Sequence, residues 1–293
     1  MSDSDDDYLY RFVFEQFGVR GEFVCLGPSW QAVRERHDYP AQVEQQLGQA
    51  LVSVLLLSGT IKFSGSLILQ LQGDGLLRSL VAQASENRTI RGMANFADSL
   101  GARQTVDRGR LLGQARLVLT AEAPGGQRYQ GIVPVDGGDI AAAVEGYFVQ
   151  SEQLPTRLWL ACEGDKAAGL FLQRLPDAGA DDEHWNRVCM LAATIRDQEL
   201  LALDAREVLH RLFHEEDLRL FEPEPVAFRC SCSRERVGNA LVSMGEGEVA
   251  QILEEMGSIE VNCEFCNAHY AFDTVDAAAL FADLPSDRPD KLQ

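Results

Sequence analysis

Four cysteines in the last quarter of the chain form two close pairs. They read Cys230-Ser231-Cys232 and, after 30 intervening residues, Cys263-Glu264-Phe265-Cys266. Two pairs of thiols that are close within each pair and far apart along the chain can supply all four ligands of a tetrahedral Zn²⁺ site. The same thiols can instead be oxidised to disulfides. The spacing therefore predicts one Zn²⁺ per chain on Cys230, Cys232, Cys263 and Cys266, at a site that is a candidate switch.

The region around these cysteines reads as a small domain over residues 229–293. Ser233 is a good N-cap for a helix that ends near Gly245, and a second helix ends at Gly257. The C-x-x-C pair then forms a tight turn between two short strands. This region has few large apolar residues with which to build a core. Metal binding could supply the missing stability, since structural zinc contributes about 10–16 kcal/mol of apparent binding energy. A purely structural zinc module remains an open alternative.

The strongly negative net charge of the chain argues against a nucleic-acid partner. The formal net charge is −19, and residues 230–293 hold 4 basic against 12 acidic side chains. Nucleic-acid affinity depends largely on Lys and Arg that neutralise phosphates, so we expect no nucleic-acid partner. The first residues, Met-Ser-Asp-Ser-Asp-Asp-Asp-Tyr, are acidic and lack the basic and apolar regions of a secretory signal, and no segment is long and apolar enough for a membrane span. We therefore expect a cytoplasmic protein in a reducing compartment, without a membrane partner.

Residues 1–176 read as an α+β domain with an antiparallel sheet and packed helices. Residues 8–14 alternate as a half-buried strand does, and residues 19–26 can pair with them. Residues 40–58 predict a helix that is apolar nearly all round in its second half, which is typical of a central core helix. Further strands are predicted at 67–71, 76–84, 89–96, 113–122, 128–135, 158–162 and 170–175, with a hairpin turn at 124–126 and a helix at 139–150. Short hairpin connections favour an antiparallel arrangement.

Residues 177–228 read as a helical linker between these two domains. The segment from Pro176 to Asp182 has the composition of a boundary. One helix is predicted over about 183–202, and a second begins at Asp204 with Glu207 at its third position, a capping box. A short helical pair cannot bury its own apolar stripes, so it must lie on another surface. An ordinary interdomain packing and a releasable cover are both consistent with this pattern.

No catalytic residues are predicted, and we expect no enzyme activity. The chain has no Walker loop, no G-x-S-x-G elbow and no Gly-rich dinucleotide fingerprint. His210 and His214 are four apart, but Arg211 stands where an H-E-x-x-H metalloprotease has Glu. Cys25, Cys162 and Cys189 are isolated and read as buried packing residues; the sequence does not assign them a redox role.

Three function classes remain at this point. Disulfides formed within each pair would close only small loops, which stabilise little, whereas zinc bridges a 30-residue loop. Oxidation would then remove a long-range link, which favours a switch. A zinc-ribbon module that binds RNA or the translation machinery, and a thiol–disulfide oxidoreductase, are the alternatives.

The cysteine pattern, extended as Cys230-x-Cys232-Ser-Arg-Glu-Arg and Cys263-x-x-Cys266-x-x-His269-Tyr270-x-Phe272, resembles the bacterial 33-kDa heat-shock proteins. The resemblance continues through most of the chain. It includes Val19-Arg20-Gly21-Glu22, His37-Asp38-Tyr39-Pro40, residues 69–75, Tyr129-Gln130-Gly131, residues 151–158 and His214-Glu215-Glu216.

This resemblance implies a redox-regulated, ATP-independent holdase chaperone of the oxidative stress response. The reduced, zinc-bound form would be inactive. Oxidation would form the disulfides Cys230–Cys232 and Cys263–Cys266, release zinc, unfold the C-terminal domain and loosen the linker. Unfolded or partly unfolded client proteins would be the partners, together with a second copy of the chain in an oxidised homodimer. The resemblance does not locate the client-binding surface.

Overall fold

The computed structural model describes residues 7–16, 18–101, 105–122, 127–176 and 182–282. The chain divides into two compact units, Met1–Arg229 and Cys230–Gln293. Over the described residues the fold is mixed α+β, as the sequence predicts, and the four-cysteine cluster lies entirely within the second unit.

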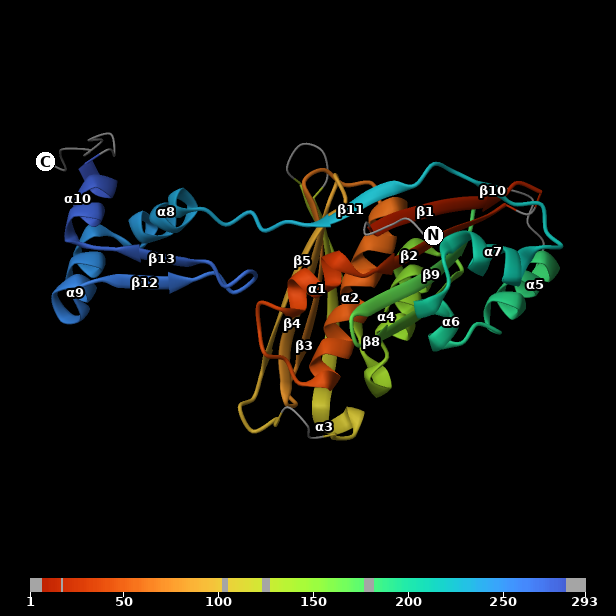
Figure 1. Ribbon diagram of the computed structural model, residues 1–293, viewed down its shortest axis with the longest axis horizontal. Helices are drawn as coiled ribbons and strands as arrows, with labels where there is room; N and C mark the ends of the chain where they lie inside the picture. Colours follow the sequence, from red (N-terminus) through yellow and green to blue (C-terminus); the bar gives the residue numbers. More distant parts are fainter. Residues whose placement is uncertain (1–6, 17, 102–104, 123–126, 177–181, 283–293) are drawn as a thin grey trace, which may run out of the picture. The chain divides into compact units, whose positions relative to one another are not determined.

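The first unit contains one large curled sheet (Figure 1). Its strands follow the order β7-β6-β3-β4-β5-β11-β1-β2-β9-β8, with β10 also paired to β1. The strands are β1 (Asp7–Phe14), β2 (Val19–Leu26), β3 (Ser66–Gly73), β4 (Leu77–Ser85), β5 (Thr89–Phe96), β6 (Ala115–Glu122), β7 (Arg128–Pro134), β8 (Thr156–Glu163), β9 (Lys166–Arg174), β10 (Arg219–Leu220) and β11 (Glu224–Phe228). The predicted strands are confirmed to within a few residues. The predicted turn at 124–126 lies outside the described residues.

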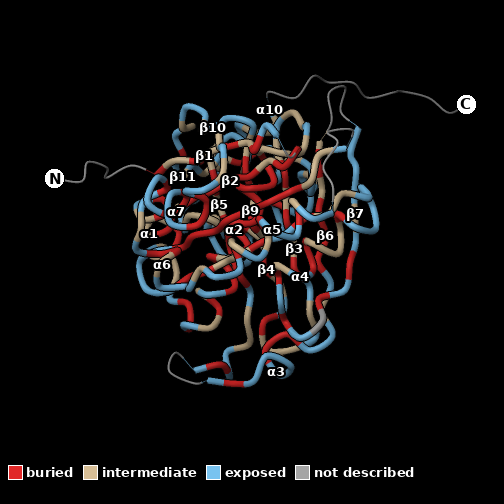
Figure 2. Tube along the Cα trace, turned by 90° about the vertical axis from the view of Figure 1, so that its right-hand side faces the viewer, coloured by how far each residue is buried: buried red, intermediate tan, exposed pale blue. Residues whose placement is uncertain are grey.

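Helix α2 (Ala41–Thr60) lies at the centre of this unit. It contacts strands from both halves of the sheet, including β4, β5, β8 and β9. Its second half is buried on all sides, which confirms the prediction from its apolar sequence. Gly48 has no room for a side chain because Cys162 of β8 lies against it. In Figure 2 the buried stretches concentrate along β9 and around α2, and exposed stretches surround them.

Shorter helices complete the part of the unit that precedes the linker. They are α1 (Pro28–Arg34), α3 (Arg108–Leu112) and α4 (Ile140–Tyr147). A short turn at Asp136–Gly138 precedes α4, and another at Phe148–Glu152 follows it. The helix predicted over 139–150 therefore ends its regular α turn at Tyr147 and continues as a wider turn. Asp7 holds α1 in place because its carboxylate accepts hydrogen bonds from the backbone N–H of Gly27 at 2.7 Å and of Ser29 at 2.8 Å.

The linker helices pack on the sheet face that α2 does not cover. They are α5 (Asp182–Ala192), α6 (Asp197–Ala202) and α7 (Ala205–Phe213). Figure 1 shows α6 and α7 beside β2 and β9, with α5 next to α7. Their apolar residues form one buried cluster with side chains of β1, β2, β8 and β9. From the helices this cluster takes Trp185, Val188, Ala192, Leu200, Leu201, Ala205, Val208, Leu209, Leu212 and Phe213. The capping box of α7 is confirmed, with Asp204 accepting from the Glu207 N–H at 2.8 Å.

Two features of the linker differ from the sequence-based expectation. The single helix predicted over 183–202 is two helices. The Thr194 hydroxyl donates a hydrogen bond to the Leu191 carbonyl at 2.7 Å. Arg196 then caps a new helix, α6, and its backbone N–H donates to the Glu199 carboxylate. The linker is also not helical to its end. Residues 219–228 form β10 and β11, and β11 pairs in parallel with β5, so the sheet is not wholly antiparallel.

The second unit is small and has its own core. It contains α8 (Arg234–Met244), α9 (Glu246–Met256), β12 (Ile259–Asn262), β13 (His269–Phe272) and α10 (Thr274–Ala282), with β12 and β13 antiparallel. The Ser233 cap of α8 is confirmed by its hydrogen bond from the Arg236 N–H. The buried cluster has few members: Leu241, Val249, Leu253, Ile259, Phe272 and Ala277. A core of this size supplies limited stability, which makes an added link between its segments important.

Candidate metal centre

Two arms of the second unit carry the four cysteines. Cys230 and Cys232 lie on a stretch without regular secondary structure that enters α8 at the Ser233 cap. Cys263 and Cys266 lie on the turn between β12 and β13. This turn is fixed by backbone hydrogen bonds, Asn267 N–H to Cys263 O at 2.7 Å and Cys263 N–H to Ala268 O at 2.9 Å. Asn267 adopts the left-handed conformation that such a turn requires, with φ of 57°.

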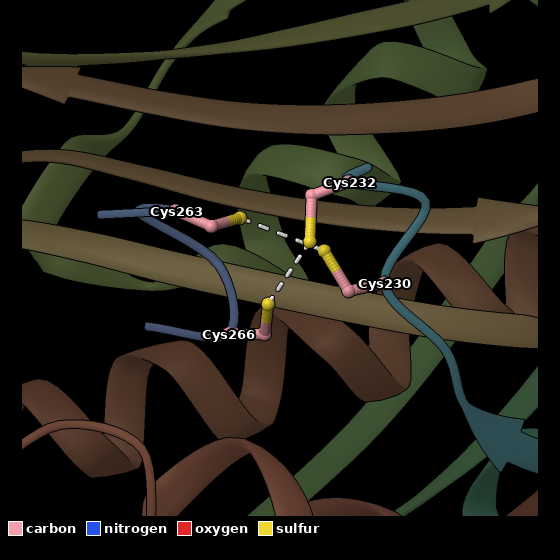
Figure 3. Close-up of side chains that lie close together, drawn as sticks. All are labelled: Cys230, Cys232, Cys263 and Cys266. Atoms are coloured by element: carbon pink, nitrogen blue, oxygen red, sulfur yellow. Dashed lines mark hydrogen bonds between the residues drawn. The ribbon is translucent and has the colours of Figure 1, made fainter. Parts of the chain in front are cut away.

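The four sulfur atoms converge on one point (Figure 3). All four Sγ atoms lie within 4.8 Å of one another. Two contacts join the arms, Cys230 Sγ to Cys263 Sγ at 3.7 Å and Cys232 Sγ to Cys266 Sγ at 3.3 Å. A tetrahedral zinc with Zn–S bonds of about 2.3 Å separates its sulfur ligands by roughly 3.8 Å. Number, chemistry and spacing of the donors therefore fit one zinc ion, and this is the one such group among the described parts of the chain.

Tyr270 contributes a polar contact that reaches across the two arms. Its hydroxyl on β13 donates a hydrogen bond to Cys232 Sγ at 3.2 Å. This bond lowers the pKa of the Cys232 thiol to about 7. Burial has the opposite effect elsewhere in the cluster, raising the pKa of Cys230 and raising that of Cys266 to about 12. Only a bound cation would make four adjacent thiolates stable together, because it compensates their mutual repulsion.

Arg234 also holds the arms together. Its guanidinium donates to the Ala271 carbonyl at 2.7 Å, pairs with Asp276 at 2.8 Å and lies over the Phe272 ring at 4.3 Å from the ring centroid. It thus ties the start of α8 to β13 and α10. Sequence reasoning singled out the cysteines and missed the contacts made by Tyr270 and Arg234. Both residues belong to the extended cysteine pattern, but the groups that they contact are 37 or more residues away in the chain, so no local pattern reveals the contacts.

The remaining candidate residues lie outside this cluster. Cys25, Cys162 and Cys189 are in the first unit; Cys162 is buried, whereas Cys25 and Cys189 are half-buried. Burial raises the pKa of all three thiols, to about 12 for Cys162 and Cys189, so they are poor nucleophiles.

The histidines do not join the cluster either. The His210 and His214 rings lie near the end of α7, tilted by 31° to each other with centroids 5.7 Å apart. His269 contacts Asn262 at 3.0 Å through Nδ1 rather than a cysteine. Among the described helices, none has both the length and the apolar composition needed to cross a bilayer.

Comparison with known proteins places the chain in a family context. A family model described as "Hsp33 protein" matches residues 7–273. The chain is 51% identical over 280 residues to a protein of Nitrosococcus oceani named 33 kDa chaperonin, covering 94% of this chain and 95% of that one. It is 46% identical over 293 residues to a 33 kDa chaperonin of Pseudomonas aeruginosa, covering 98% of each.

A solved structure agrees with the fold. The crystal structure of a 33 kDa chaperonin (heat shock protein 33 homolog) from Thermotoga maritima superposes with a TM-score of 0.82. The match covers 95% of this chain and 98% of that one, at 23% sequence identity.

Proposed function

The chain belongs to the Hsp33 family, and from that membership we propose that it is a redox-regulated holdase. It binds unfolding and oxidatively damaged proteins without ATP and keeps them from aggregating. It works in the cytoplasm during oxidative stress, and no catalytic step is part of this function. The silent form is reduced, and the active form is oxidised.

In the silent form Cys230, Cys232, Cys263 and Cys266 hold one zinc ion. The ion supplies a link between the two arms that the short core of the second unit does not supply by itself. The convergence of all four Sγ atoms within 4.8 Å is the observation that supports this most strongly. Tyr270 and Arg234 orient the arms, as residues around a metal site commonly do.

Oxidation converts the four thiolates to the disulfides Cys230–Cys232 and Cys263–Cys266. Formation of each disulfide removes two electrons from a pair of thiolates, and one molecule of hydrogen peroxide takes up these electrons and two protons, so that its O–O bond breaks and two waters form. Disulfide sulfurs are poor zinc ligands, so zinc leaves. The new bonds close only small loops and do not reconnect the arms, which lets the second unit unfold. The sulfur contacts in the structure run between the arms, so this pairing rests on the family resemblance.

The linker is the element whose release exposes apolar surface. Helices α5, α6 and α7 cover one face of the sheet, and the cluster they form there is buried. Helix α5 contributes Trp185, Val188 and Ala192 to this cluster, whereas Met190 on its other side is 67% exposed. Loosening the linker, residues 177–228, would uncover both partners of this contact, and a second copy of the chain could then form the oxidised homodimer.

An RNA-binding zinc module and a thiol–disulfide oxidoreductase are the weaker alternatives. The second unit has 12 acidic and 4 basic side chains, which opposes binding to a phosphate backbone. The thiol with the lowered pKa, Cys232, lies in a cluster that suits a metal, which favours metal binding over thiol–disulfide catalysis.

The test compares single cysteine variants in a client aggregation assay. Cys232→Ser and Cys266→Ser should prevent stable zinc binding and remove the strict dependence of protection on oxidant. Cys25→Ser is the matched control, because it removes a thiol outside the cluster and should behave as wild type. Disulfide mapping of the oxidised wild-type chain should find the two pairs proposed above. Protection that is equal in the reduced and oxidised wild-type protein would refute the redox switch.

A further inference from the structure

The outer edge of β1 is covered by a segment of the linker. On one side β1 pairs with β2 from Tyr8 to Phe14. On the other side β10 covers Phe12 and Val13, and β11 covers residues 7–9. Both covering strands lie in residues 219–228, immediately before the metal-binding unit. Figure 1 shows β11 lying between β1 and β5.

The covered edge has backbone groups ready to pair with another strand. The Phe221 N–H donates to the Arg11 carbonyl at 2.9 Å, so Arg11 turns its backbone toward the cover. Backbone groups alternate along an antiparallel strand, which places those of Leu9 and Val13 on the same side. Without residues 219–228, β1 would present these groups on an eight-residue strand rich in aromatic and branched side chains. Such an edge is a template for adding a strand from another chain.

Strand β11 occupies a slot between β1 and β5, and its side chains show which residue types fit there. Along β11, Glu224, Val226 and Phe228 turn inward at alternate positions, whereas Pro225 and Ala227 are exposed. Val226 is 6% exposed and belongs to the core around α2.

Arginine side chains lie against the first and the last of these three inward positions, Glu224 and Phe228. The Glu224 carboxylate pairs with Arg11 at 2.6 Å and with Arg88 at 2.7 Å. The Phe228 ring lies 4.2 Å from the Arg36 guanidinium and packs against the core. An acidic, an aliphatic and an aromatic side chain at alternate positions therefore fill the slot.

We propose that the outer edge of β1 is a client-binding site that takes an extended segment of an unfolding protein as an added strand. The preferred segments have acidic, aliphatic and aromatic residues at alternate positions. Main-chain pairing supplies affinity that tolerates many sequences, and the three side-chain positions supply preference. The proposal rests on the proposed function, because loosening of the linker is what removes residues 219–228 from the edge.

The experiment uses the full-length protein and a labelled synthetic peptide of residues 218–229, the native cover. Fluorescence anisotropy should show binding to the oxidised protein and at least tenfold weaker binding to the reduced, zinc-loaded protein, whose edge is already paired within the chain. Excess peptide should also abolish protection of a client in the aggregation assay.

Two altered peptides test the mode of binding. N-methylation at Phe221 removes the hydrogen bond to Arg11 and should weaken binding about tenfold, as expected for a backbone hydrogen bond and the added methyl group. A peptide with Glu224→Lys places a cation against Arg11 and Arg88 and should also bind about tenfold more weakly. A peptide with Ala227→Ser is the control, because this side chain is exposed, and it should bind as the native sequence does.

The outcomes separate this proposal from the function beneath it. If the oxidised protein protects clients but the native peptide neither binds nor competes, the edge is not the client site and the holdase function stands. Equal binding of the native and N-methylated peptides would likewise overturn strand addition. If the oxidised protein protects no client, the holdase function is wrong and the client site falls with it.

Discussion

Replacing Phe213 by Ala should weaken the linker cover without touching a cysteine. Phe213 ends α7, is 2% exposed and packs edge-on against Phe14 with ring centroids 5.0 Å apart. Its ring also lies 6.2 Å from that of Phe12. Truncation of a buried Phe to Ala typically costs about 3–5 kcal/mol. Since about 1.4 kcal/mol is a factor of ten, undocked α7 should become roughly 100- to 4,000-fold more populated.

The assay is hydrogen exchange of the reduced, zinc-loaded variant, followed by mass spectrometry of peptides from α7. Exchange there should accelerate by about the same factor where opening is local. The variant should also give partial protection of a client without oxidant. Met190→Ala is the matched control, because Met190 is 67% exposed on α5, and a substitution there should change stability by less than about 0.5 kcal/mol.

Unchanged exchange in α7 of the Phe213→Ala protein would refute the reasoning that this aromatic contact holds the cover. Accelerated exchange without any protection of client would show that the contact energy is understood but that the cover does not hide a client-binding surface.

Three further predictions concern the metal site, pH and the cap of α7. Tyr270→Phe removes the hydroxyl that donates to Cys232 Sγ and should weaken zinc binding about 10- to 100-fold in competition with a chromophoric chelator, whereas Ser243→Ala should not; equal affinities would contradict a role for the hydroxyl. Burial raises the pKa of Glu22 to about 8 from an ordinary value of 4.5, so the folded form holds this proton more tightly. Its contribution to stability is therefore full below the unfolded pKa and is lost as pH rises through about 8; Glu22→Gln should flatten that fall in urea denaturation, and an unchanged slope would assign the fall to other groups. Asp204→Ala should cost about 1 kcal/mol of unfolding free energy, and no loss would show that the cap contributes nothing.

The sequence predicts those parts of the fold whose signal is local. The strand at residues 7–14, the central helix α2 and the caps at Asp204 and Ser233 depend on periodicity or on residues three positions apart. The break between α5 and α6 was not predicted. The apolar stripe from Trp185 to Leu200 continues across the break, because both helices pack on the same cluster. Periodicity reports burial on a common surface and is insensitive to a single turn that changes direction.

Strand β11 is the clearest case of non-local structure. Its sequence, with Pro225 between Glu224 and Val226, argues against a strand that pairs on both sides. Pro225 is tolerated because it lies opposite Tyr8, at a position that needs no N–H, between the hydrogen-bonding pairs. Its other neighbour, β5, is more than 130 residues away in the chain, so no local pattern reveals the pairing.

The metal site follows the same division. The four ligand candidates can be read from two spacings, since only cysteine pairs at such distances suit a tetrahedral metal. The hydroxyl of Tyr270 over Cys232 depends on how the two arms meet, and it becomes visible only when β13 is folded beside the first arm.

Simultaneous measurement of zinc release and client protection tests the central claim most directly. The reduced, zinc-loaded protein would be treated with peroxide at raised temperature, with zinc followed by a chromophoric chelator and light scattering of a chemically unfolded client followed in the same samples. The account predicts that release and protection rise together, at one zinc per chain, and that reductant with zinc reverses both. Zinc release without protection, or full protection by the reduced protein, would contradict it and leave the four cysteines with a structural role alone.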